Sequence, residues 1–167
     1  MLERVPAAPD PRESDRTGLP LRVYVRRSGS SDSLVRVETR LPSDVTVVEE
    51  AVELIVRHCL SGHSASQRFR FNLSVVLSEC LANAILCGNA QHPDKSVAVR
   101  AELRQDIVEL EVTDEGDGFD PATVRDPTTQ DDLEEPCGRG LFLIRSLADE
   151  VRFNPKGNSI CLMLRRK

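Results

Sequence analysis

Two neighbouring segments in which apolar and polar residues alternate place the strongest constraint on the fold. VAVRAEL (residues 97–103) and IVELEVT (residues 107–113) both place apolar side chains at alternate positions. Because successive side chains of a β-strand point to opposite faces, each segment predicts a strand with one apolar face. The short link between them predicts an antiparallel hairpin. The apolar face of such a sheet must be buried against a second layer, and helices are the expected cover.

The rest of the chain supplies further strands and these helices. Alternating valines on either side of the turn-rich SGSSDS predict another hairpin, formed by LRVYVRR and SLVRVETR. Apolar residues recur at helical spacing after the capping candidates Ser43 and Asp44, and again over residues 67–87, where Gly88 is the expected stop. SICLMLRR predicts a final strand. We therefore expect an α/β two-layer sandwich with a mixed, mainly antiparallel sheet and helices on one face.

Length and composition indicate one domain and exclude several functions. Residues 1–19 are rich in Pro, Asp, Arg and Glu and are expected to be disordered, whereas residues 20–167 form the domain. A net charge of −5 without a basic patch argues against nucleic acid as a partner. No apolar run approaches a membrane span and the start lacks a signal peptide, so we expect a cytoplasmic protein. Five cysteines without a CxxC pair predict neither a disulfide nor a zinc site.

Two polar residues interrupt the apolar face of the helix expected over residues 67–87. Glu79 and Asn83 are four positions apart, so they lie on one side of the helix, in line with Cys87. A carboxylate and a carboxamide are thereby held one turn apart near the core. Taken alone, this pattern favours a partly exposed polar edge with a local Glu–Asn hydrogen bond over a functional site.

The stretch TDEGDGFDP follows directly after the second alternating strand. Continuing the period of two makes Asp114 face the core, where a carboxylate needs a partner. Gly116 and Gly118 allow a sharp turn and a close approach to a bound object. A calcium-binding EF-hand loop is excluded, because its sixth and twelfth positions would be Phe119 and Arg125.

An irregular acidic stretch and a glycine-led helix complete the pattern. The chain from Asp120 to Cys137 has no periodicity that predicts an element, and such a loop is typical of a lid or a disordered insert. GRGLFLIRSLADEV then predicts a helix that begins at glycines. The free backbone N–H groups and the dipole of a helix start suit a phosphate group.

In this order, the segments resemble three motifs of the GHKL (Bergerat-fold) ATPase superfamily, specifically of its anti-sigma-factor serine kinases. SECLANAILCGN resembles the N box, DEGDGFDP resembles the DxGxGF box, and GRGLFLIRSLADEVRF resembles the second glycine box. The resemblance covers roughly residues 40–165. It implies the Bergerat ATP-binding fold, with the nucleotide between helices and lid and with ATP and Mg²⁺ as cofactors.

The resemblance also implies a role for each candidate residue. Glu79 would be the catalytic base that deprotonates the attacking serine hydroxyl, and Asn83 would coordinate Mg²⁺. Asp114 would accept a hydrogen bond from the adenine amino group, while Gly116 and Gly118 would let the chain pass close to the nucleotide. The residues that would hold phosphate are Gly138, Arg139, Gly140 and Leu141. For Arg139, an ordinary solvated loop residue is an equal alternative.

The sequence departs from the family pattern at two places. Cys87 stands where related sequences commonly have histidine, so a polar contact from that position is lost unless the cysteine simply packs there. The predicted lid from Asp126 to Glu135 holds five acids and no Lys or Arg. Such a lid would repel a triphosphate that it covered directly, so it is expected to swing outward or to face a basic partner.

The resemblance implies an ATP-dependent protein-serine kinase that phosphorylates a STAS-domain anti-sigma antagonist and sequesters a sigma factor or a similar regulator. It also implies a homodimer. One alternative is a nucleotide-binding partner-switching module without kinase activity. A histidine-kinase-type catalytic domain is a further alternative, disfavoured because no upstream helix pair with a phosphoacceptor histidine is found. We expect His58, His63 and His92 to be ordinary surface residues.

Overall fold

The computed structural model describes residues 21–28, 34–121 and 136–166. The expected disordered segment 1–19 and the acidic lid segment 126–135 lie outside the described residues. The elements are β1 (Val23–Ser28), β2 (Leu34–Pro42), α1 (Val48–Cys59), α2 (Gln67–Asn83), β3 (Ser96–Arg104), β4 (Ile107–Asp114), α3 (Pro136–Leu147), β5 (Glu150–Phe153) and β6 (Ser159–Arg165).

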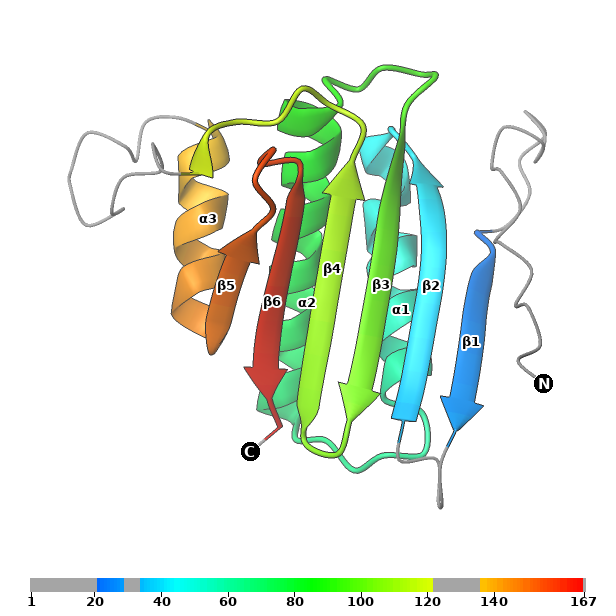
Figure 1. Ribbon diagram of the computed structural model, residues 1–167. Coiled ribbons are helices and arrows are strands. Elements are labelled where there is room, and N and C mark those ends of the chain that lie inside the picture. Colours follow the sequence, from blue (N-terminus) through cyan, green and yellow to red (C-terminus); the bar gives the residue numbers. More distant parts are fainter. Residues whose placement is uncertain (1–20, 29–33, 122–135, 167) are drawn as a thin grey trace, which may run out of the picture.

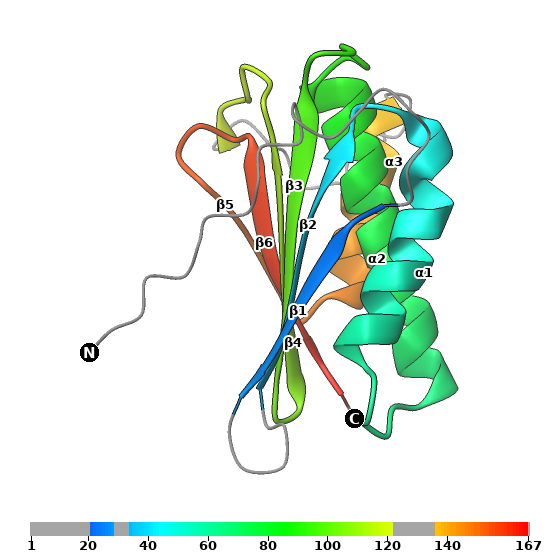
Figure 2. The ribbon, with the colours of Figure 1, turned by 90° about the vertical axis from the view of Figure 1, so that its right-hand side faces the viewer.

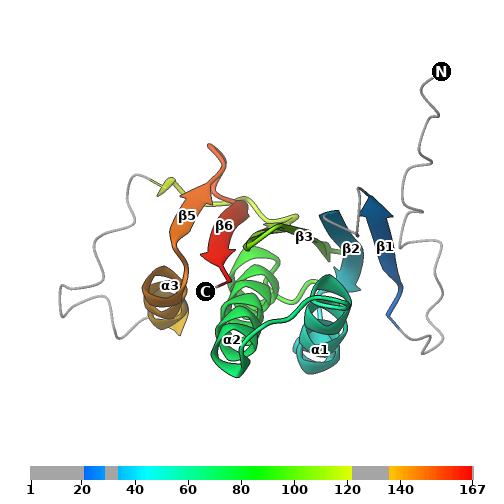
Figure 3. The same ribbon diagram turned by 90° about the horizontal axis from the view of Figure 1, so that it is seen from below.

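The strands form one sheet, which is covered by helices on one face only. Its order is β1-β2-β3-β4-β6-β5 (Figure 1), and each neighbouring pair is antiparallel. All three α-helices pack on the same face, as Figures 2 and 3 show from two directions. The expected two-layer α/β sandwich is confirmed, with antiparallel pairing throughout the described strands.

The core lies between these two layers. The alternation that predicted β3 and β4 puts Val97, Val99, Val108, Leu110 and Val112 on the buried face. Helices α1 and α2 meet this face with large buried side chains that include Ile55, Leu73, Leu77 and Leu81. The apolar faces of the strands, which repeat every two residues, and of the helices, which repeat about every 3.6 residues, therefore form one apolar cluster.

Helix α1 follows the capping pattern that was expected. The carboxylate of Asp44 accepts a hydrogen bond from the Thr46 N–H at 2.9 Å and caps a short 3₁₀ turn, Val45–Val47. The α-helix then begins at Val48 and buries Ala51 and Ile55, among others. The predicted cap is thus confirmed, with one 3₁₀ turn between it and the helix.

The end of α2 differs from the prediction. Gly88 does not stop the helix, because a π turn, Ala84–Gly88, continues it, and the Asn89 N–H donates to the Ala84 carbonyl at 2.8 Å. The chain turns away at Ala90 and Gln91, which have the positive φ values of 51° and 54°. Gly88 is needed for a contact described below rather than for a left-handed backbone.

Strand β5 was not predicted. It has only four residues, EVRF, which is too short for a convincing alternation. Its pairing with β6 places Val151 opposite Leu162 and Phe153 opposite Ile160. Segment EVRF therefore forms a strand because it pairs with β6, and this pairing cannot be predicted from the four residues alone.

The segment Gln67–Gly88 is apolar enough to raise the question of a membrane span. It has 22 residues with a hydropathy of 1.5, and by length and composition alone it could cross a membrane. The sequence pattern had not indicated a span over these residues. One face of the helix is packed into the core through Leu73, Leu77 and Leu81. Core helices of soluble proteins meet the same test, so composition is a weak argument for a span here.

A carboxylate is buried on the face of the sheet that no helix covers. Glu102 is 2% exposed and accepts hydrogen bonds from Arg36 at 2.7 Å, from Arg100 at 3.1 Å, and from Arg104. Burial raises the pKa of Glu102, but the hydrogen bonds from the three arginines outweigh burial and lower it to about 2. This cluster joins β2 and β3 through side chains in addition to the backbone ladder.

We expect Glu102→Gln to lower the free energy of unfolding by about 2 kcal/mol at pH 7, because charged hydrogen bonds are lost. The stabilisation from the lowered pKa is present above the ordinary value of 4.5 and is lost as the pH falls towards 2. The difference between variant and wild type should therefore shrink over that interval. Urea unfolding at pH 7 and pH 3 measures both effects. Glu53→Gln on the exposed side of α1 should change stability by less than about 0.5 kcal/mol, and an equal loss in both variants would contradict the prediction.

Candidate functional site

The fold brings the polar segments singled out in the sequence to one end of the molecule. Strand β4 ends there at Asp114, helix α2 ends there in its π turn, and α3 begins there (Figure 1). The turn between β5 and β6 lies at the same end. Segments that are far apart in the sequence thus form one candidate site.

Glu79 and Asn83 lie where α3 packs against α2. A Cβ atom on Gly140 would come within 2.7 Å of Glu79 Oε2 and 3.0 Å of Asn83 Nδ2. Both side chains are half-buried, and neither forms a hydrogen bond or an ion pair with the described residues. The local Glu–Asn hydrogen bond that the simpler explanation required is therefore not formed. None of the described residues therefore occupies the polar side-chain atoms of Glu79 or Asn83.

Asp114 faces the helix layer, as the alternation of β4 predicted. It pairs with Val97, and its carboxylate lies so close to Gly88 that a Cβ there would be 2.4 Å from Cγ of Asp114. Oδ1 accepts a hydrogen bond from the Gly116 N–H at 2.8 Å. Burial raises the pKa of Asp114, and the Gly116 hydrogen bond together with the charges of Lys156 and Lys95 opposes that rise.

The glycines after Asp114 are fixed by contacts within the protein. A Cβ on Gly116 would lie 2.0 Å from the Gly88 carbonyl oxygen, and one on Gly118 would lie 2.0 Å from the Lys156 carbonyl oxygen. Gly118 also has a φ of +77°, which side chains rarely adopt. Close backbone packing thus requires both glycines, independently of the nucleotide contact that the resemblance implied.

The glycine-led segment begins its helix earlier than predicted. Helix α3 starts at Pro136, and proline is favoured at the first helical position because it has no N–H to leave unpaired. Gly138 stands in the first turn, together with Arg139. Gly140 and Leu141 stand in the second turn, where backbone N–H groups ordinarily bond within the helix. The phosphate contacts of these four residues stay a prediction, and Gly138 has the position that suits them best.

Comparison with known proteins agrees with this arrangement. Residues 41–164 match the family of histidine kinase-like ATPase domains. The chain belongs to this family. It is 27% identical over 119 residues to the serine-protein kinase RsbW of Oceanobacillus iheyensis, covering 65% of this chain and 75% of that one. It is 32% identical over 111 residues to RsbW of Bacillus subtilis, covering 59% and 68%. It is 36% identical over 83 residues to an anti-sigma F factor of Halalkalibacterium halodurans, covering 48% and 56%.

Within this ATPase domain, Asn89 links the start of β3 to the loop after β4, and the sequence did not indicate this role. Its side chain is fully buried, donates to the Ser96 carbonyl at 3.0 Å and accepts from the Glu115 N–H at 2.8 Å. Glu115 is exposed, and its carboxylate accepts from the Ser96 N–H at 3.0 Å and lies 3.7 Å from Arg40. These contacts hold the loop after β4 against the start of β3.

The turn between β5 and β6 is the second missed part of the site. Asn158 donates its side-chain N–H to the Asp114 carbonyl at 2.7 Å, and its own carbonyl accepts the Asp114 N–H at 2.9 Å. Lys156 Nζ donates to the Gly116 carbonyl at 2.8 Å. The polar composition of NPKGNS is typical of a turn, but nothing in it shows which distant loop it contacts.

The bonding state of the cysteines differs from the expectation at one residue. Cys87 is disulfide-bonded, whereas Cys59, Cys80 and Cys161 are free. The prediction of no disulfide is therefore wrong, because spacing along the chain does not reveal pairs that the fold creates. In the part of the chain that the structure describes, no cluster of three or more His, Cys, Asp or Glu residues could hold a metal ion.

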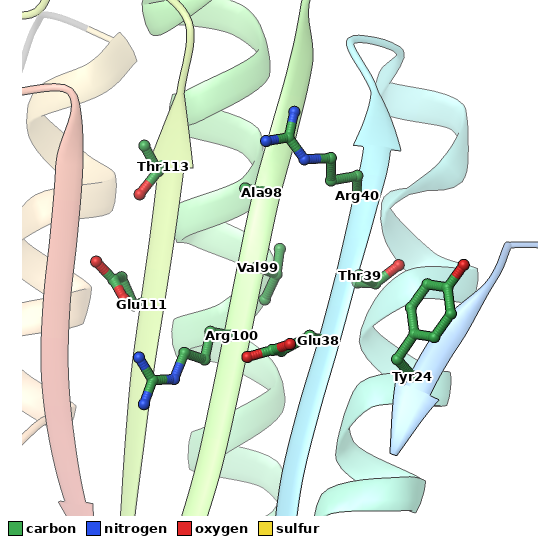
Figure 4. Close-up of a pocket in the computed structure, with 9 residues that line it drawn as sticks. All are labelled: Tyr24, Glu38, Thr39, Arg40, Ala98, Val99, Arg100, Glu111 and Thr113. Carbon is green, nitrogen blue, oxygen red and sulfur yellow. The ribbon is translucent and has the colours of Figure 1, made fainter. Parts of the chain in front are cut away.

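A hollow on the open face of the sheet is separate from this site (Figure 4). Charged side chains from three neighbouring strands surround it, together with smaller residues and one aromatic ring. The lining comprises Tyr24, Glu38, Thr39, Arg40, Ala98, Val99, Arg100, Glu111 and Thr113. Neither Glu79 nor Asp114 contributes to it, so the hollow has no part in the chemistry considered below.

Proposed function

We propose that the protein is an ATP-dependent protein-serine kinase that phosphorylates a STAS-domain anti-sigma antagonist and binds a sigma factor or a similar regulator. The observation that carries this proposal is the pair Glu79 and Asn83, half-buried under α3 without a partner among the described residues. A structural pair would be expected to satisfy its own hydrogen bonds. The names of the relatives, serine-protein kinase and anti-sigma F factor, support the choice of substrate and partner.

The arrangement of the residues fits Mg²⁺·ATP. Asp114 would accept a hydrogen bond from the adenine amino group, and the absence of a side chain at Gly140 lets α3 lie close to Glu79 and Asn83. Asn83 would supply one oxygen ligand to the Mg²⁺ ion, which neutralises charge on the phosphates when bound. Glu79, one turn away, would orient the serine hydroxyl of the substrate and accept its proton. The start of α3 directs its positive dipole end to the same region.

Titration calorimetry with ATP, in the presence and absence of Mg²⁺, tests the binding half of the proposal. Magnesium-dependent binding with a Kd in the micromolar to millimolar range, about −8 to −4 kcal/mol, is the expected result. Transfer of labelled phosphate to a serine of a STAS-domain protein tests the chemical half. Binding without transfer would favour a partner-switching module that uses nucleotide only to set its shape. Absence of ATP binding would overturn the proposal.

We expect Gly140→Ala to separate stability from activity. Alanine favours the interior of a helix over glycine by about 1 kcal/mol, so α3 itself should become more stable. The new methyl group would meet Glu79 Oε2 at 2.7 Å and push the carboxylate away, so phosphotransfer should fall at least about tenfold. Thermal unfolding and phosphotransfer rates measure the two effects. Ser146→Ala on the exposed side of α3 is the matched control, and full activity of Gly140→Ala would contradict the assignment of Glu79.

A further inference from the structure

We propose that Lys156 is a positioning residue of the nucleotide site, which holds the loop after Asp114 and so favours a purine with an amino group at its sixth position. The inference rests on the proposed function of Asp114. Lys156 lies in the turn between β5 and β6, outside the three motifs that indicated the site. It does not need to touch the nucleotide, because it acts through Gly116 and Asp114.

The contacts of Gly116 show how this works. Its N–H donates to Asp114 Oδ1 at 2.8 Å, and its carbonyl accepts from Lys156 Nζ at 2.8 Å. Gly116 is also pressed against the Gly88 carbonyl, so the peptide has little freedom to move. The ammonium group of Lys156 therefore fixes the hydrogen-bond donor that in turn orients the Asp114 carboxylate.

The turn that carries Lys156 is itself well fixed. Asn154 Oδ1 accepts the N–H groups of Asn158 at 3.1 Å and Ser159 at 3.2 Å, and Asn158 is bonded to the backbone of Asp114 in both directions. Gly157 packs its backbone against Phe119. Lys156 thus extends from a rigid turn, so its side chain can hold Gly116 rather than follow it.

Charge adds to this geometry. The charges that act on Asp114 come from Lys156 in the β5–β6 turn and from Lys95 in the turn before β3. Its own loop carries the acidic Glu115 and Asp117, and the π turn contributes the uncharged Gly88. Both lysines favour the ionised carboxylate, which can only accept hydrogen bonds. An ionised Asp114 attracts the amino group of adenine and repels the carbonyl of hypoxanthine. Loss of Lys156 should therefore weaken adenine binding selectively.

The test compares ATP with inosine triphosphate, which carries an oxo group in place of the amino group. Lys156→Met is expected to weaken ATP binding about tenfold and inosine triphosphate binding less than about threefold, since a charge-assisted hydrogen bond is lost. The loss for ATP should grow as the pH falls, because Asp114 then protonates at a higher pH than in the wild type. Lys156→Arg should restore the preference for ATP. Lys95→Met removes a nearby charge and keeps the bond to Gly116, so it should cost less than Lys156→Met.

The results distinguish a selective effect of Lys156 on adenine binding from a general effect on nucleotide binding or folding, and from failure of the proposed function. Equal weakening of both nucleotides by Lys156→Met would overturn the inference, because a general effect on phosphates or on folding does not distinguish the bases. In an Asp114→Asn background, Lys156→Met should leave the ratio of the two affinities unchanged, and a further change would also overturn it. If Lys156→Met does not fold, Lys156→Ala, which also removes the donor to the Gly116 carbonyl, replaces it with the same expected outcomes. Failure of the wild type to bind ATP would instead overturn the proposed function.

Discussion

Replacement of Glu79 by glutamine should lower the rate of phosphotransfer about 10²- to 10⁴-fold, the usual contribution of a general base, and leave ATP binding nearly unchanged. Glutamine has almost the same shape as glutamate but cannot accept the proton of the serine hydroxyl. Because Glu79 has no hydrogen bond to the described residues, the substitution should also leave the free energy of unfolding within about 0.5 kcal/mol of the wild type.

The measurement combines single-turnover phosphotransfer with calorimetric ATP titration on the same preparation. Glu53→Gln, on the exposed side of α1, is the control for loss of one carboxylate and should remain fully active. Undiminished transfer by Glu79→Gln would show that the base lies elsewhere. Loss of ATP binding in that variant would show that Glu79 acts on the nucleotide rather than on the substrate.

The second large effect is expected at Gly157. This residue has a φ of +74°, and a Cβ there would lie 1.9 Å from the Phe119 carbonyl oxygen, while Gly118 meets the Lys156 carbonyl in the same way. Gly157→Ala should therefore lower the free energy of unfolding by about 3 kcal/mol, as backbone strain and a clash with fixed backbone add together. ATP affinity should fall as well, because the loop after Asp114 loses its support.

A second glycine with a positive φ distinguishes the cost of backbone strain at Gly157 from the cost of the steric clash with Phe119. Gly62 has a φ of +80°, but a Cβ there would meet nothing within 4 Å. Gly62→Ala should cost only about 1 kcal/mol, the price of the left-handed conformation alone. Urea unfolding of both variants gives the difference. Equal losses would mean that the close packing between the β5–β6 turn and the loop around Gly118 contributes nothing.

The sequence predicted the parts of the fold that repeat with a fixed period. Alternation along β3 and β4 predicted both strands and the inward direction of Asp114, and helical spacing predicted the buried side of α2. Strand β5 was missed because four residues carry too little periodicity. Helix α3 was predicted to begin at the glycines of GRGLFLIRSLADEV, but it begins at Pro136, which suits a first helical position better because proline has no N–H to leave unpaired.

The contacts that support the candidate site were less accessible to sequence reasoning. Gly88 was interpreted as a helix stop, yet its small size is needed beside Asp114, which is remote in the sequence. Asn89 and Lys156 are polar residues in ordinary-looking turns, and their partners become apparent only when the β4 end and the β5–β6 turn are adjacent. Local patterns indicate candidate site residues more readily than they indicate the residues that hold the site in place.

The direction of β6 has a practical consequence for anyone who attaches a reporter to this protein. The pairing of Arg165 with Ile107 puts the last residues of β6 beside the beginning of β4, whereas Asp114 is at the opposite end of that strand. A fluorophore or an immobilisation tag joined after β6 would thus be carried roughly the length of a strand away from the end of β4 where nucleotide binding is proposed. Surface-capture and fluorescence assays can use that attachment point without obstructing the region where a substrate would approach.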